Sequence, residues 1–363
     1  MGTSWSSSAE SEQNNERRMK KQKLLSKKTF GHHEVEGYNG DDTDIQNHVE
    51  SCRKNPGHAN FIPITRFTQT DLPEDLRDDT LYELIKAISD ITVRIRVTKV
   101  SPGRPQFFPN TEDPYPFSGT NVKMRLGSGE IDVYKFIKGW GYNSQGRSSN
   151  FFDKDKAIEA TYKACPCEKC GQSDKPKEVW WEIFVYTAAH VVFDEIEAIN
   201  TTCTLLYDNK GRPETKALNK FSVSYVSVEY DKCELKHVTC DVSLGDKLYK
   251  MSRRCCDLWE EVRPKHCRSQ SKFMFLVSHP HGGIKQLSLG EWRENEKVKK
   301  LDKNFVLTKL TYTAGTCPGS SGAHVYCLGF RGGHLHGGAL EPNINYSCVL
   351  YTYKTKSQHR RYI

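Results

Sequence analysis

The chain has 363 residues, of which 36% are hydrophobic, and it carries 53 Lys and Arg against 45 Asp and Glu, a net charge of +8. This length is enough for one large domain or two medium ones with a buried core. Much of the positive charge lies in one run, RRMKKQKLLSKK, at residues 17–28. A basic face spread over a fold is therefore not expected, which argues against nucleic-acid binding.

Residues 1–60 are polar and aperiodic, so we expect a disordered basic tail there and a linker over residues 61–79. The start, MGTSWS, fits the pattern for N-myristoylation, with Gly2 as the acceptor. One acyl chain binds membranes weakly, and residues 17–28 would add electrostatic attraction to a membrane surface. The alternatives are an accidental match in a Ser- and Lys-rich tail, or a nuclear-localisation signal in the basic run.

No stretch has the ~20 apolar residues that a membrane-spanning helix needs, and residues 1–60 contain no secretory apolar region. We therefore expect a cytoplasmic protein that is not secreted, either free or membrane-associated. Its 13 cysteines should then be reduced thiols or metal ligands rather than a disulfide framework.

Hydrophobic periodicity predicts a mostly β chain with two helices. From residue 79, Leu81, Leu84, Ile85 and Ile88 follow helical spacing, and residues 91–100 then alternate as in a half-buried strand. A second helix is predicted over residues 245–262. Further strands are predicted over residues 122–131, 178–188, 201–209, 221–230, 273–280, 305–314, 323–330 and 346–353. Many short strands without βαβ alternation favour a β-barrel or sandwich.

The stretch VYTAAHVVFD, residues 185–194, shrinks from large side chains to Thr187-Ala188-Ala189 before presenting His190. Small neighbours indicate that this ring needs access to a partner. A nucleophile for such a base stands in GTCPGSSGAHVY, residues 315–326, where glycines on either side of Ser321 allow a sharp turn. The N–H groups of Gly319 and Ser321 would then form an oxyanion hole.

A carboxylate is needed to orient the imidazole. Asp241, in CDVSLGDKL, stands before an apolar run that would bury it, so we predict it as the acid. Asp246 and Asp231 are the alternatives.

The segments TAAH at 187–190, CDVSL around Asp241, and GSSG at 319–322 together resemble the signature segments of chymotrypsin-like serine peptidases, in the chain order His, Asp, Ser. The resemblance covers residues 80–355. It implies two six-stranded antiparallel β-barrels, one over about 80–244 and one over about 270–355, with the helix 245–262 inserted between them and a tail over 356–363. GSG at 127–129 and SHPHGGIKQLSLG at 278–290 fit this plan, the latter as in HtrA-type members. The motifs and CPCEKC upstream are also similar to uncharacterised trypsin-like peptidases of marine invertebrates.

The resemblance implies a serine endopeptidase that works through an acyl-enzyme, with Ser321 as nucleophile, His190 as base and Asp241 as the orienting acid. Ser320 stands where trypsin-type enzymes carry the aspartate used in zymogen activation, so activation of that kind is not expected. The alternative is a catalytically silent protein of the same fold that binds peptides or partner proteins through the same cleft.

The resemblance places the substrate pocket at Gly315 and Thr316 and at HLHGG, residues 334–338, which contains His334 and His336. With Gly315 at its base, the pocket has no acidic group to select Lys or Arg. His334 falls near the position where viral chymotrypsin-like proteases use a histidine to read Gln or Glu. A small or apolar side chain, or no strict preference, stays open.

The run CPCEKC brings Cys165, Cys167 and Cys170 within six residues. Thiolates this close repel one another unless a soft cation neutralises them, which predicts structural zinc with Cys203 as the fourth ligand. Reduced surface thiols and a redox switch are the alternatives. No cofactor is expected for catalysis.

Overall fold

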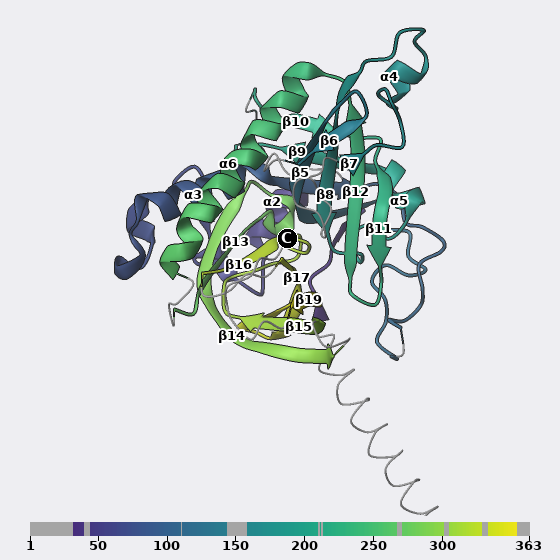
Figure 1. Cartoon of the computed structure of the whole chain (residues 1–363). Coiled ribbons are helices and arrows are strands. Elements are labelled where there is room, and N and C mark those ends of the chain that lie inside the picture. The colour runs from purple at the N-terminus through teal and green to yellow at the C-terminus, as the bar shows by residue number, and fades with distance from the viewer. Residues whose placement is uncertain are drawn as a thin grey trace, which may run out of the picture.

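The computed structural model describes residues 32–39, 44–109, 111–143, 158–209, 211, 213–266, 271–300, 305–328 and 333–353. Within these ranges the chain is mostly β, as predicted, and forms two antiparallel sheets, of ten and nine strands, where two six-stranded barrels were expected. Figure 1 shows the two sheets one above the other, with the helices α3 and α6 on one side. Gly2 and residues 17–28 lie outside the described residues, so acylation and membrane binding stay predictions.

The first sheet follows the order β10-β9-β4-β5-β8-β12-β11, and β2, β6 and β7 attach to it. Its strands bury one row of alternating side chains, such as Val93, Ile95 and Val97 of β4. The bounds are β2 (Glu36–Tyr38), β4 (Thr92–Val97), β5 (Met124–Ile137), β6 (Trp140–Tyr142), β7 (Ile158–Glu159), β8 (Val179–Thr187), β9 (Thr201–Leu205), β10 (Lys216–Leu218), β11 (Ser222–Ser227) and β12 (Lys232–Thr239).

Six strands of the second sheet form a closed ring, because β13 pairs with β14, β14 with β15, β15 with β18, β18 with β17, β17 with β16, and β16 with β13. The short strands β1, β3 and β19 attach to this ring. The bounds are β1 (His32–His33), β3 (Ile62–Pro63), β13 (Phe273–Ser278), β14 (Gln286–Lys300), β15 (Phe305–Tyr312), β16 (His324–Cys327), β17 (His334–Glu341), β18 (Ile344–Ser347) and β19 (Leu350–Tyr353).

Both predicted helices are present. The carboxylate of Asp78 accepts a hydrogen bond from Thr80 N and begins α3 (Asp79–Ile91), whose predicted apolar residues are buried. The second, α6 (Val242–His266), is longer than predicted and packs on β5, β8 and α3. Short helices and turns complete the set: α2 (Asp44–Glu50), α4 (Glu168–Gly171), α5 (Glu195–Ile199), η1 (Pro56–His58), η2 (Gln69–Asp71), η3 (Glu74–Leu76) and η4 (Pro280–Gly282). Over the described ranges, none of the helices is both long and apolar enough to cross a bilayer.

The prediction of a disordered tail over residues 1–60 is wrong for residues 32–39 and 44–60. β1 pairs with β17 of the second sheet, and β2 pairs with β5 of the first. This segment is polar but buried: His33, Glu34 and Glu36 are 7%, 3% and 6% exposed. Its partners are themselves charged or hydrogen-bonding groups, so no apolar pattern marks it in the sequence.

Candidate active site

His190 and Asp231 form a buried pair at the edge of the first sheet. His190 Nδ1 lies 2.7 Å from Asp231 Oδ2, and the backbone N–H of His190 donates to Asp231 Oδ1 at 2.9 Å. Burial would raise the pKa of Asp231, but the charges and hydrogen bonds of His190 and His33 outweigh it and lower that pKa. Asp231 is therefore a carboxylate that fixes the orientation of the His190 ring.

The prediction that Asp241 is the acid beside His190 is wrong. It lies exposed before α6, where its carboxylate accepts a hydrogen bond from Leu244 N at 3.1 Å. The reason is the antiparallel pairing of β12 with β8, which places Cys233 opposite Thr187 and Thr239 opposite Trp181. The beginning of β12, not its end, therefore lies beside His190. Of the two alternatives, Asp246 pairs with Lys135, 2.9 Å away.

The turn that carries Ser321 packs directly against the end of β8. A Cβ at Gly322, where φ is +87°, would lie 2.2 Å from Thr187 Oγ1 and 3.0 Å from Ala188 N. Ser321 O accepts a hydrogen bond from Ser128 N at 2.8 Å. The small residues before His190 thus let the Ser321 turn pack closely. This explains the small side chains that the sequence shows at this position.

The backbone of this turn leaves two donors available. Gly319 has φ +92°, and a Cβ there would lie 2.8 Å from backbone atoms of residues 279–282. Ser320 N and Gly322 N donate to Cys317 O and His336 O. The N–H groups of Gly319 and Ser321 make no hydrogen bond to any residue in the described part of the chain. Ser320 is buried and its hydroxyl accepts from Ser278 Oγ at 3.1 Å.

A buried ionic network bonds the backbone carbonyl of His190. Two nitrogens of Arg104 lie 3.1 Å from His190 O. Arg104 and Arg125 both pair with Glu197 at 2.7 Å, and all three side chains are at most 1% exposed. Burial would raise the pKa of Glu197, but the hydrogen bond and charge of Arg104 and the charge of Arg125 outweigh it and lower that pKa. Glu197 is therefore ionised and offsets part of the charge of the two arginines.

A second buried carboxylate lies beside the Ser321 turn. Glu34 Oε2 is 2.7 Å from His336 Nε2, and Glu34 Oε1 accepts from Lys54 Nζ. Lys54 Nζ also donates to Thr316 Oγ1 at 2.9 Å. Burial would raise the pKa of Glu34, but the hydrogen bond and charge of His336, together with Lys54, lower it to about 2. We call Lys54, Thr316 and His336 the glutamate subsite.

Of the predicted pocket residues, Thr316 and His336 meet in the glutamate subsite. The expectation that His334 reads an acidic or amide side chain is wrong in position, because His334 Nε2 lies 3.1 Å from Thr308 Oγ1 inside the second sheet. Gly315 lies against Asn60 and Phe61 instead. Glu34 and Lys54 had no signal in the sequence, since both fall in the segment expected to be disordered.

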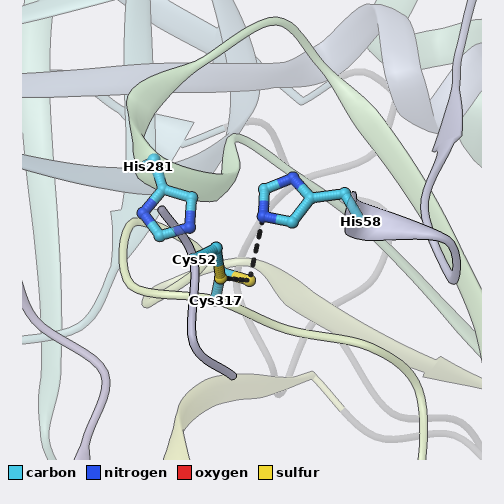
Figure 2. Close-up of side chains that lie close together, drawn as sticks. All are labelled: Cys52, His58, His281 and Cys317. Carbon is cyan, nitrogen blue, oxygen red and sulfur yellow. Dashed lines mark hydrogen bonds between the residues drawn. The ribbon is translucent and has the colours of Figure 1, made fainter. Parts of the chain in front are cut away.

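The ligand atoms of Cys165, Cys167, Cys170 and Cys240 all lie within 4.8 Å of one another. The prediction of Cys203 as the fourth ligand is wrong, because Cys203 is completely buried in β9, between β4 and β10. Cys240 follows the end of β12 and its Sγ lies 3.7 Å from Cys167 Sγ. A second group, Cys52, His58, His281 and Cys317, was not anticipated (Figure 2), because its members are scattered over 265 positions of the chain.

No family model and no curated protein matches the chain. Among solved structures, the active form of the Rv3671c protease from M. tuberculosis aligns with 75% of this chain and 82% of its own, at 13% identity and a TM-score of 0.36. The HtrA-type protease AlgW with a tripeptide aligns with 75% of this chain and 60% of its own, at 12% identity and a TM-score of 0.36. Both are proteases.

Replacing Glu197 by Gln should destabilise the protein by about 3 kcal/mol, because it leaves the buried charges of Arg104 and Arg125 uncompensated. Urea denaturation would measure this loss. Glu195→Gln, an exposed change on the same helix, should cost less than about 1 kcal/mol. Equal effects of the two substitutions would contradict a structural role for the network.

Proposed function

We propose that the protein is a serine endopeptidase in which Ser321, His190 and Asp231 act as the catalytic triad. The supporting observation is the buried His190–Asp231 pair, which leaves His190 Nε2 without a hydrogen bond to any described residue, at the place where the Ser321 turn packs against β8. A histidine held through Nδ1 by a carboxylate keeps Nε2 for the hydroxyl of a nucleophilic serine. In this structure Ser321 Oγ donates to Glu34 O, so His190 Nε2 would take the hydroxyl proton when that contact is exchanged.

In this mechanism Ser321 Oγ attacks a peptide carbonyl while His190 Nε2 takes the hydroxyl proton. The imidazolium, stabilised by Asp231, then protonates the leaving amine, and water hydrolyses the acyl-enzyme with His190 again as the base. The unbonded N–H groups of Gly319 and Ser321 would stabilise the oxyanion, each by about 3–4 kcal/mol. Each step uses only side chains, backbone N–H groups and water.

Asp231→Asn should lower peptidase kcat by about 10³–10⁴-fold, because the amide favours the wrong histidine tautomer. Asp241→Asn should leave kcat within about twofold, because Asp241 is exposed and only caps α6. Hydrolysis of a denatured protein and labelling by a fluorophosphonate would measure both variants, with Ser321→Ala as the inactive control. Absence of any Ser321-dependent hydrolysis or labelling would favour the catalytically silent peptide-binding protein instead.

We propose further that Cys165, Cys167, Cys170 and Cys240 hold a structural zinc ion. Four sulfur ligands close the tetrahedral shell, which is typical of a structural rather than a catalytic site. The first three ligands lie just before and within α4, ahead of β8, and the fourth follows β12. The ion would fasten this segment to the sheet that carries His190.

Replacing Cys167 and Cys240 together by Ser should remove one equivalent of zinc from the purified protein, because each sulfur supplies a quarter of the coordination shell. Cys203→Ser should keep that equivalent, since Cys203 lies in the core of the first sheet. Elemental analysis by mass spectrometry measures both. Loss of zinc from Cys203→Ser alone would restore the original ligand assignment.

A further inference from the structure

Residues 32–38 run through the active site as an extended strand. Before Glu34, His32 and His33 pair with Ala339 and Gly338 of β17, and Glu34 N donates to Gly337 O at 3.4 Å. After Glu34, β2 pairs with β5 of the other sheet. In strand addition, an extended peptide pairs its backbone with the edge of a sheet. Here the residues before and after Glu34 pair with two different sheets in this way. The segment is therefore held as a peptide ligand would be.

The residue at the centre of this strand presents its carbonyl to the proposed nucleophile. Ser321 Oγ donates to Glu34 O at 2.7 Å. The ring of His33 lies 4.8 Å from the ring of His190, edge to face, and stacks on Phe108 at 4.5 Å. The Glu34 carbonyl thus lies beside Ser321, and His33, one residue earlier, lies against the ring of His190. The N–H groups of Gly319 and Ser321 do not bond this carbonyl in the uncut chain.

The Glu34 side chain occupies a subsite that matches its charge and shape. Its two oxygens are bound separately, one by Lys54 and the other by His336. His336 is fixed in turn, because its Nδ1 lies 2.6 Å from the hydroxyl of Tyr312. A neutral side chain would leave the partly buried Lys54 charge without its ionic partner, although Thr316 and Asn345 would still accept from it, and a cation would be repelled.

From these contacts we infer that the chain is its own substrate, cut between Glu34 and Val35, and that the enzyme selects glutamate before the scissile bond. This inference rests on the proposed peptidase activity. Ser321 Oγ would bond to the carbonyl carbon of Glu34, and the Glu34–Val35 amide bond would break. His190 would carry the serine proton to the Val35 nitrogen. Water would then release Glu34 as a carboxylic acid and restore Ser321.

The glutamate subsite survives this cleavage, because Lys54 lies downstream of the cut and stays with residues 35–363. Residues 32–34 fill the site until they leave, so the uncut chain should be inactive on other substrates. Cleavage would then convert an occupied site into an open one with the same preference.

Intact mass and N-terminal sequencing of the full-length protein should show a product that begins at Val35. Ser321→Ala should stay uncut, Glu34→Ala should be cut at least about tenfold more slowly, and Glu50→Gln, an exposed change on α2, should be cut like the wild type. Ser321-dependent activity without a cut after residue 34 would overturn the inference and leave the peptidase intact. Absence of both would remove the peptidase as well.

The cleaved enzyme should prefer peptides with Glu over Gln or Lys before the scissile bond. Lys54→Met should lower kcat/KM for the Glu peptide by about ten- to a hundredfold, the effect of losing one charged hydrogen bond, and should change the Gln peptide little. Lys247→Met, exposed on α6, is the matched control. An equal loss on both peptides would contradict a role of Lys54 in selection.

An independent observation is the second Cys and His group, in which all four ligand atoms lie within 4.8 Å of one another. Cys52 Sγ is 3.5 Å from Cys317 Sγ, and His58 Nε2 is 3.7 Å from Cys317 Sγ (Figure 2). Zinc bonds of about 2.3 Å to sulfur and about 2.0 Å to nitrogen set neighbouring tetrahedral ligands about 3.3–3.8 Å apart. The two distances fall in this range.

His281 is oriented for such a role. Its Nδ1 lies 2.5 Å from Glu36 Oε2, which leaves Nε2 to bind a metal. A carboxylate behind the histidine is the usual outer partner of a zinc ligand, since it fixes the tautomer and raises basicity. Figure 2 shows the rings of His281 and His58 on the same side of the two sulfurs, and they stack at 5.2 Å.

We propose that Cys52, His58, His281 and Cys317 bind one zinc ion. The ion would join the N-terminal segment, residues 32–39 and 44–60, to the Ser321 turn, which we also call the nucleophile turn. Cys317 stands two residues before Gly319, and His281 N donates to Pro318 O at 2.6 Å. Cys52 and His58 stand on either side of Lys54 in the chain. The ion would therefore fix the turn and the glutamate subsite together.

In protein that already carries the Cys167→Ser and Cys240→Ser changes, His58→Ala or Cys52→Ser should remove the remaining equivalent of zinc. Cys256→Ser, on α6, should keep it. Cobalt substitution should give the visible absorption of a tetrahedral site in the parent and not in these variants. Retention of the metal by both variants, or a Cys52–Cys317 disulfide in the protein as isolated, would overturn the assignment.

Discussion

The proposed active site depends on the register of one pair of strands. Because β12 runs antiparallel to β8 with Cys233 opposite Thr187, the turn before β12 brings Asp231 under His190. The buried carboxylate offsets its desolvation with bonds from the ring and backbone of His190 and with the nearby His33. A shift of register by one residue would move Asp231 away and turn every side chain of β12 to the other face.

The N-terminal segment contributes several residues to the proposed site. It supplies Glu34 to the nucleophile turn, Lys54 to the glutamate subsite, and Cys52 and His58 to the proposed metal site. The second sheet alone contributes His336 and Thr316, which could bind an acidic side chain but carry no fixed positive charge. Selection of glutamate would therefore depend on residues more than 250 positions away in the sequence.

Local patterns predicted many of the elements and brought out His190 and Ser321, whereas the partners set by tertiary structure were not predicted. Helical spacing gave α3 and α6, and alternation gave strands that include β4, β5, β8, β9, β13 and β15. The strands β12, β14 and β17 were not predicted. Small residues around His190 and glycines around Ser321 indicated that the two approach one another. Asp231 stands in a turn at φ +51° with no apolar run to mark it as buried, so Asp241 appeared the better acid. Cys203 was predicted as the fourth metal ligand instead of Cys240 for the same reason. Spacing along the chain does not show which end of a strand lies beside a loop.

The strength of the N-terminal strand's attachment bears on when the site would open. Only two residues of β1 pair with β17, and such short pairing is weak in water. Glu34 adds its bonds to Lys54 and His336, and His33 adds its stacking on Phe108. Both contacts would persist after the chain is cut at the Glu34 carbonyl. The product would thus leave slowly unless a substrate that also offers glutamate displaces it. A metal ion on Cys52 and His58 would keep Lys54 in place during that exchange, so the subsite would be rigid while its occupant changes.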